Sequence, residues 1–163
     1  MKKDFTYGGT DEERLNDLQQ MLDDKTISAI LFARGGYGGV RIIDKLDFKK
    51  YKRTPKWIIG FSDATIFHSH INQNYRIASI HSKMCNSFPN DWSKAEPLQK
   101  ETIESINQCL KGEKMKYFFP PNEKNKTGLA TGELVGGNLK TLESLAGSES
   151  DINTKDKILF VED

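Results

Sequence analysis

The sequence has few cysteines, little charge imbalance and no long apolar run, and each of these shortages excludes a class of protein. The two cysteines in 163 residues, Cys85 and Cys109, form no C-x-x-C pair and no metal-ligand spacing. We therefore expect buried or free thiols of a reducing compartment. The 24 basic and 23 acidic side chains provide no sustained basic face, which argues against nucleic-acid or membrane-surface binding. No apolar run approaches the roughly 18 residues that span a bilayer.

What the sequence does contain is an alternation of helical and strand-like segments. Thr10 and Glu13 form a capping box before a stretch with an apolar helical face. Two apolar runs typical of buried strands follow, at 26–33 and 56–61, and each ends in a turn. Further strands are expected at 76–80, 129–135 and 157–163, and further helices at 40–46, 63–72 and 97–110. The stretch 136–147 is expected to form a turn at its two glycines and then a helix. This order predicts an α/β fold with a Rossmann-like parallel sheet.

The composition changes near the middle of the chain. Residues 120–128 are polar, charged and begin with proline, which predicts a linker. We therefore expect an N-terminal nucleophile domain at 1–119 and the beginning of a second, C-terminal α/β domain at 129–163. The parallel sheet would lack its first strand, and the apolar residues 158–161 would have no neighbouring elements packed against them. The chain is therefore expected to be the middle portion of a longer protein.

A serine lies at the junction between the second buried strand and the next helix. The sequence Gly60-Phe61-Ser62-Asp63-Ala64 is a G-x-S-x-A variant of the nucleophile elbow. Such a turn exposes the serine Oγ at the end of the sheet, and the first N–H groups of the helix face a developing oxyanion. The alternative is that Ser62 only caps the helix, which would fit a sugar- or nucleotide-binding α/β domain.

A second glycine-rich turn, R-G-G-Y-G-G at 34–39, also follows a buried strand. Both turns are expected at the carboxyl edge of the parallel sheet, where open α/β sheets bind ligands. Because glycine lets the backbone approach a reacting carbonyl closely, Gly36 is a candidate oxyanion donor beside the N–H of Asp63. The run lacks the spacing of dinucleotide-binding and P-loop motifs, which disfavours a phosphate-binding loop.

A nucleophilic serine needs a base, and the chain has three histidines. On a helix that begins at residue 63, His68 and His70 would lie about 9 and 12 Å along the axis from Ser62. Neither could take its proton. His81 follows the third expected strand and is the one internal candidate, although a histidine there is commonly a packing residue.

Five blocks of the sequence, in this order, resemble the LD-carboxypeptidases, the muramoyl-tetrapeptide carboxypeptidases related to microcin self-immunity peptidases. They are ARGGYGGVRIIDKLDF, PKWIIGFSDATIFH, IHSKM, GELVGGNLKTL and ILFVED. The resemblance implies that Ser62 is the nucleophile and that Glu162 orients a catalytic histidine located downstream of Asp163. GGYGGVR favours the murein-recycling branch over the microcin branch.

The resemblance also implies the biochemical setting. It suggests a cytoplasmic, homodimeric serine carboxypeptidase that removes the terminal D-alanine from an L-centre in murein tetrapeptides, with no metal or cofactor. Gly35, Tyr37 and Asn138 are the expected substrate contacts. Two departures from the family pattern are HSKM, where H-G-P-M is usual, and Glu133, where a basic residue is frequent. Without the downstream histidine, this chain is expected to be inactive.

Overall fold

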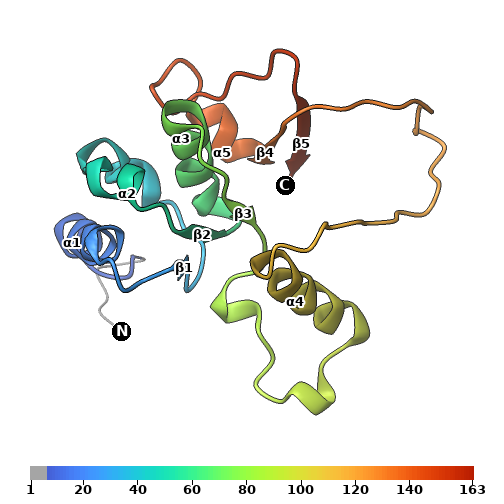
Figure 1. The fold of residues 1–163 in the computed structure, drawn as a ribbon, viewed down its shortest axis with the longest axis horizontal. Helices are drawn as coiled ribbons and strands as arrows, with labels where there is room; N and C mark the ends of the chain where they lie inside the picture. The colour runs from blue at the N-terminus through green and yellow to red at the C-terminus, as the bar shows by residue number, and fades with distance from the viewer. Residues whose placement is uncertain (1–6) are drawn as a thin grey trace.

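The computed structural model describes residues 7–163, which form two small parallel sheets with surrounding helices (Figure 1). The strands are β1 (Ala29–Leu31), β2 (Trp57–Gly60), β3 (Ile80–His81), β4 (Leu134–Asn138) and β5 (Ile158–Glu162). The α-helices are α1 (Asp11–Asp23), α2 (Lys49–Arg53), α3 (Thr65–Tyr75), α4 (Pro97–Leu110) and α5 (Leu139–Ser144). Short 3-10 helices are η1 (Gly39–Arg41), η2 (Ile43–Lys45), η3 (Ser62–Ala64), η4 (Cys85–Ser87) and η5 (Trp92–Lys94).

The first sheet has the order β1-β2-β3, and all its strands are parallel. Ile30 pairs with Ile58, and Gly60 pairs with His81. Parallel strands need crossovers, which here run through η1, η2 and α2, and then through η3 and α3. The glycine loop, residues 34–39, and Ser62 both follow the carboxyl ends of strands and therefore share one edge of this sheet.

Alternate residues of β2 face two different cores. Ile58 belongs to a large apolar cluster with side chains of α1, α2 and α3, whereas Ile59 packs with Ile80 and with Ile106 of α4. A strand buried on both faces must be apolar at successive positions, which explains the continuous apolar run. The predicted α/β fold with a parallel sheet is confirmed.

The second sheet consists of β4 and β5, paired in parallel from Leu134 with Ile158 to Asn138 with Glu162. Gly136 and Gly137 lie inside β4, although the sequence predicts a turn there. A Cβ on Gly136 would lie 1.8 Å from the carbonyl oxygen of Phe160, and one on Gly137 would lie 2.5 Å from Thr65 Oγ1. The glycine pair therefore lets β4 approach both its partner strand and α3.

Other predicted boundaries also shift. The strand expected at 76–80 is reduced to β3, because Arg76 adopts a left-handed conformation (φ 58°) at the end of α3. The helix expected at 40–46 is split into η1 and η2. The capping box at Thr10 and the helix at 97–110 are confirmed.

The stretch between α4 and β4 has no helix or strand and forms a wide excursion in Figure 1. The linker predicted at 120–128 lies within it, and the division into domains stays a prediction. Within residues 7–163, no helix combines the length and the apolar character that crossing a membrane requires.

Candidate active site

Ser62 sits in a strained turn between β2 and α3. Its φ is 56°, in the left-handed region that costs a residue with a side chain on the order of 1–2 kcal/mol. A Cβ on Gly60 would lie 2.8 Å from the Cβ of Ala64, so small residues on either side allow the tight turn. The residue at the N-cap of α3 is Ala64, and no side chain caps that helix. The alternative interpretation of Ser62 as a helix cap is therefore wrong.

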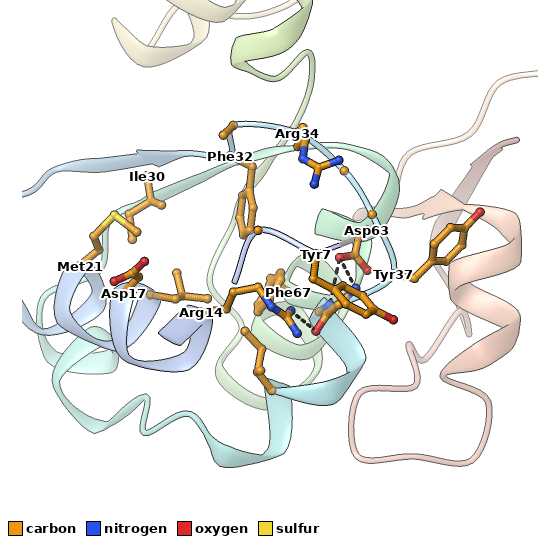
Figure 2. A pocket seen from close by; sticks show the side chains of 18 of the residues that line it. Tyr7, Arg14, Asp17, Met21, Ile30, Phe32, Arg34, Tyr37, Asp63 and Phe67 are labelled. Carbon is orange, nitrogen blue, oxygen red and sulfur yellow. Dashed lines mark hydrogen bonds between the residues drawn. The ribbon is translucent and has the colours of Figure 1, made fainter. Parts of the chain in front are cut away.

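The glycine loop comes close to Ser62 at Gly35. A Cβ on Gly35 would lie 3.1 Å from Ser62 Oγ, whereas one on Gly36 would meet no atom within 4 Å. The space where a Cβ of Gly36 would lie is thus open, and Gly35 is the residue packed against the serine. Tyr37 is 83% exposed, and Figure 2 shows its ring directed away from the other labelled side chains.

A cavity of about 560 Å³ extends from the glycine loop along the outer edge of β1. Apolar side chains of α1 and β1 form one part of its lining, including Met21 and Ile30, and the loop with Asp63 forms another (Figure 2). The predicted site residues Gly35, Gly36, Tyr37 and Asp63 all line it.

The carboxyl end of the second sheet brings Asn138 beside Glu162. Asn138 begins α5, because its Oδ1 accepts hydrogen bonds from the N–H and the hydroxyl of Thr141, each at 3.0 Å. Its backbone N–H donates to Thr65 Oγ1 at 3.0 Å, which ties β4 to the helix that follows Ser62. Its Nδ2 lies 3.4 Å from Asp163 Oδ1. Its predicted substrate contact stays a prediction.

His81 and Glu162 meet between the two sheets. His81 Nε2 lies 4.0 Å from Glu162 Oε1, and its ring packs edge-on against Phe160 at 4.9 Å between centroids. Burial lowers the pKa of His81, and the nearby Glu162 acts in the opposite direction. Buried atoms His81 Nδ1 and Glu162 Oε1 lack hydrogen-bond partners. This polar pair sits beside the strand end that leads to Ser62.

The other two histidines, His68 and His70, are buried and form hydrogen bonds inside the protein. Both ring nitrogens of His68 are engaged, Nδ1 with Ser79 Oγ at 2.8 Å and Nε2 with the carbonyl of Gly60 at 2.9 Å. Burial lowers the pKa of His68 to about 4. His70 Nδ1 lies 2.9 Å from Ser150 Oγ. These contacts agree with the expectation that neither histidine takes a proton from Ser62.

Glu133 directly precedes β4, at the end of the strand opposite Asn138. It forms ion pairs with Lys157 at 3.3 Å and Arg76 at 3.9 Å, and it accepts a hydrogen bond from Asn72 Nδ2. Asn72 is the largest of the influences that lower its pKa. The departure from the family pattern at this position therefore creates a surface charge cluster away from Ser62.

Sequence reasoning missed two contacts of the site. One joins His81 to Glu162, and the other joins the Asp63 carboxylate to the glycine loop, where Oδ2 accepts hydrogen bonds from the N–H groups of Gly38 and Gly39. The second had a signal, because the turn that holds Asp63 and the glycine loop were both expected at the same edge of the sheet. The first joins residues remote in sequence and had none.

Comparison with known proteins matches both ends of the chain to one family. Residues 1–82 match the LD-carboxypeptidase N-terminal domain, and residues 131–163 match the LD-carboxypeptidase C-terminal domain. The first match alone covers half of the chain. The chain therefore belongs to the LD-carboxypeptidase family, which is a family of peptidase hydrolases.

Relatives and solved structures agree with this assignment. The "probable murein peptide carboxypeptidase" of Bacillus subtilis is 37% identical over 95% of this chain and 48% of its own length. An MccF-like protein from Bacillus anthracis has a TM-score of 0.80 at 26% identity, covering 98% of this chain and 54% of that one. Muramoyltetrapeptide carboxypeptidase from Oxalobacter formigenes shares the fold, with a TM-score of 0.77 at 24% identity over 100% of this chain and 54% of that one. The chain spans about half the length of the curated relatives it matches.

Proposed function

We propose that this chain is the nucleophile-bearing part of a serine carboxypeptidase that removes the terminal D-alanine from an L-centre, such as meso-diaminopimelate, in murein tetrapeptides. The observation that carries the proposal is the strained Ser62 at the end of β2, with no capping role and with Gly35 against its Oγ. Strain at a serine that does not serve the helix is typical of a nucleophile elbow.

The reaction would follow the general course of serine acyl transfer. Ser62 Oγ attacks the scissile carbonyl carbon while its proton passes to a histidine, and the N–H groups of Asp63 and Gly36 stabilise the oxyanion. Collapse of the intermediate breaks the C–N bond, and the histidine returns the proton to the departing D-alanine amine. Water then hydrolyses the acyl-enzyme by the same steps. Glu162 would fix the tautomer of the histidine.

The histidine of this triad is proposed to come from downstream of Asp163, as the family resemblance implies. What supports this is the engagement of His68 and His70 in the core. His81 contacts Glu162 and is the internal alternative. We therefore propose that the 163-residue chain by itself does not cleave tetrapeptide. Release of D-alanine by the chain, lost in His81→Ala, would instead make His81 the base.

The substrate class rests on the relatives named for murein peptides. A role in peptidoglycan recycling, a cytoplasmic location and a homodimer belong to the same proposal, and so do substrate contacts by Gly35, Tyr37 and Asn138. Near-neutral charge continues to argue against nucleic acid and membrane surfaces as partners.

The test is release of D-alanine from a murein tetrapeptide by the full-length protein, with Ser62→Ala as the matched control. Release that disappears in the variant supports the proposal. A folded full-length protein that releases no D-alanine, but binds the peptide or a sugar, would favour a binding domain instead.

A further inference from the structure

We propose that the side chain of Asp63 is a positioning residue that holds the glycine loop, residues 34–39, in place against Ser62. This inference rests on the proposed function, in which Ser62 is the nucleophile and the loop supplies an oxyanion donor. The carboxylate of Asp63 would hold the loop, whereas the backbone N–H of the same residue would stabilise the oxyanion.

The contact is made by one oxygen atom. Asp63 Oδ2 accepts hydrogen bonds from the N–H of Gly38 at 3.1 Å and the N–H of Gly39 at 2.9 Å. Hydrogen bonds to an ionised acceptor are stronger than neutral ones. Because Asp63 follows Ser62 directly, a single side chain links the nucleophile turn to the loop that faces it.

The loop is held from its other side by α1. Arg14 donates from Nη1 to the carbonyl of Gly38 at 2.8 Å, and its Nε donates to the carbonyl of Gly9 at 3.3 Å. Asp11 pairs with Arg14 and also accepts hydrogen bonds from Arg41 Nε at 2.8 and 2.9 Å. The N–H of Gly38 is therefore fixed by the elbow, and its carbonyl is fixed by the first helix.

The glycines of the loop divide into two kinds. A Cβ on Gly38 would lie 2.1 Å from Arg14 Nη1, and one on Gly39 would lie 3.1 to 3.2 Å from Ile66, Phe67 and Asp63. Gly38 and Gly39 thus allow Asp63 and Arg14 to hold the loop from two sides, an arrangement that we call the clamp. In contrast, Gly35 packs on Ser62, and the Cβ position of Gly36 faces open space. The hydrogen bonds of the clamp hold the loop at Gly38 and Gly39, three and four residues after Gly35 in the same short loop.

The Asp63 carboxyl is buried, and the groups that offset the cost of its burial belong to the glycine loop and to α1. Burial is the largest influence on this side chain and raises its pKa, while the N–H groups of Gly39 and Gly38 and the charge of Arg14 lower it. A carboxylate is costly to bury unless hydrogen bonds compensate it. Here the compensating hydrogen bonds come from Gly38 and Gly39, which belong to the loop that Asp63 positions.

The decisive experiment compares Asp63→Ala and Asp63→Asn in the full-length enzyme, with kcat and KM measured for D-alanine release. An oxyanion contact acts in the transition state, so Asp63→Ala should lower kcat about 10²-fold with KM changed less than about threefold. Asparagine keeps an acceptor oxygen, so Asp63→Asn should recover kcat to within about tenfold of wild type. Asp91→Ala is the control, since Asp91 also accepts a backbone N–H, from Ser93 at 3.0 Å, but lies at η5.

A second readout needs no catalysis. In the full-length protein, NMR hydrogen exchange at the Gly38 and Gly39 amides should accelerate at least tenfold in Asp63→Ala and should stay near wild type in Asp63→Asn and Asp91→Ala. If Asp63→Ala does not fold, Arg14→Gln removes the opposite half of the clamp and should lower kcat in the same way.

Unchanged exchange in Asp63→Ala, or a kcat within threefold of wild type, would overturn the proposal. The same holds if Asp63→Asn loses as much kcat as Asp63→Ala. Absence of D-alanine release by the wild-type enzyme would overturn the proposed function, and with it the oxyanion role of the loop, while exchange would still report whether the clamp exists.

Discussion

The region around Ser62 and the region around Glu162 are built very differently. Ser62 lies at the end of a sheet packed on both faces, with a large apolar cluster beneath it. Glu162 ends a two-stranded sheet whose outer side chains Leu159 and Val161 are each 51% exposed. The second sheet and α5 pack against α3. This contact, here called the seam, includes the Asn138 to Thr65 hydrogen bond and the packing of His81 on Phe160.

The difference separates two requirements of the proposed chemistry. The geometry of the nucleophile depends on local turns and a well-packed core. Glu162, which would orient the base, is placed by a small sheet whose outer face is largely exposed. The glycines of β4 let this sheet pack closely against α3. Substitutions of Ser62 or Glu162 should therefore act on the chemical step, whereas protonation of the buried His68 and substitutions where β4 packs on α3 should act on stability.

The largest expected effect comes from removing the Ser62 hydroxyl. In the full-length enzyme, Ser62→Ala should lower the turnover of tetrapeptide about 10⁶-fold, as for other serine nucleophiles. The circular dichroism spectrum and melting temperature should stay near wild type, because the side chain caps no helix. Retention of more than about a tenth of the activity would show that another group attacks the substrate.

A smaller loss of activity is expected at Glu162. Glu162→Gln preserves the size of the side chain but removes the charge that would stabilise an imidazolium, so kcat should fall about 10⁴-fold. The matched control is Glu149→Gln, which changes an exposed glutamate in the same part of the chain. Equal activity of the two variants would remove Glu162 from the triad.

Acid should destabilise the first region through His68. Its pKa is about 4 in the folded chain, against an ordinary value of 6.5, because the ring is buried. Between these values the unfolded chain binds a proton that the folded chain excludes, so stability falls as pH decreases, by up to about 3 kcal/mol. Burial also lowers the pKa values of His70 and His81, which adds in the same direction.

Urea unfolding of the 163-residue chain from pH 7.5 to 4.5 measures this dependence, with His68→Gln as the comparison. The variant should show a flatter dependence of the unfolding free energy on pH. The same slope in both proteins would mean that His68 is not the group that titrates.

The smallest effect is expected at the seam. Gly137 has a φ of 146°, and its Cβ would lie 2.5 Å from Thr65 Oγ1, whereas Gly147 has a φ of 77° and open space around it. Gly147→Ala should cost about 1 kcal/mol from backbone strain alone. Gly137→Ala should cost about 2 kcal/mol more, because β4 must move away from α3. Equal costs, measured by urea unfolding, would contradict the close packing at the seam.

Local signals in the sequence predicted the parts of the fold that depend on neighbouring residues. The capping box at Thr10, the helix at 97–110 and the strand-to-helix turn at Ser62 each follow from a short pattern of side chains. The parallel sheet follows from the order of the apolar runs.

What the sequence did not predict depends on contacts between distant segments. Gly136 and Gly137 resemble a turn, and only the approach of Phe160 and Thr65 explains why they occupy a strand. The meeting of His81 with Glu162 is of the same kind. The strand at the glycine pair and the contact of His81 with Glu162 both depend on tertiary packing. No short pattern in the sequence indicates such packing.

If Ser62 is an activated nucleophile, a fluorophosphonate should label the full-length protein covalently at this residue. We expect one label per chain, mapped by peptide mass spectrometry to Ser62, and no label in Ser62→Ala. A folded and tetrapeptide-cleaving protein that takes no label at Ser62, or takes it at another residue, would show that Ser62 is not the nucleophile.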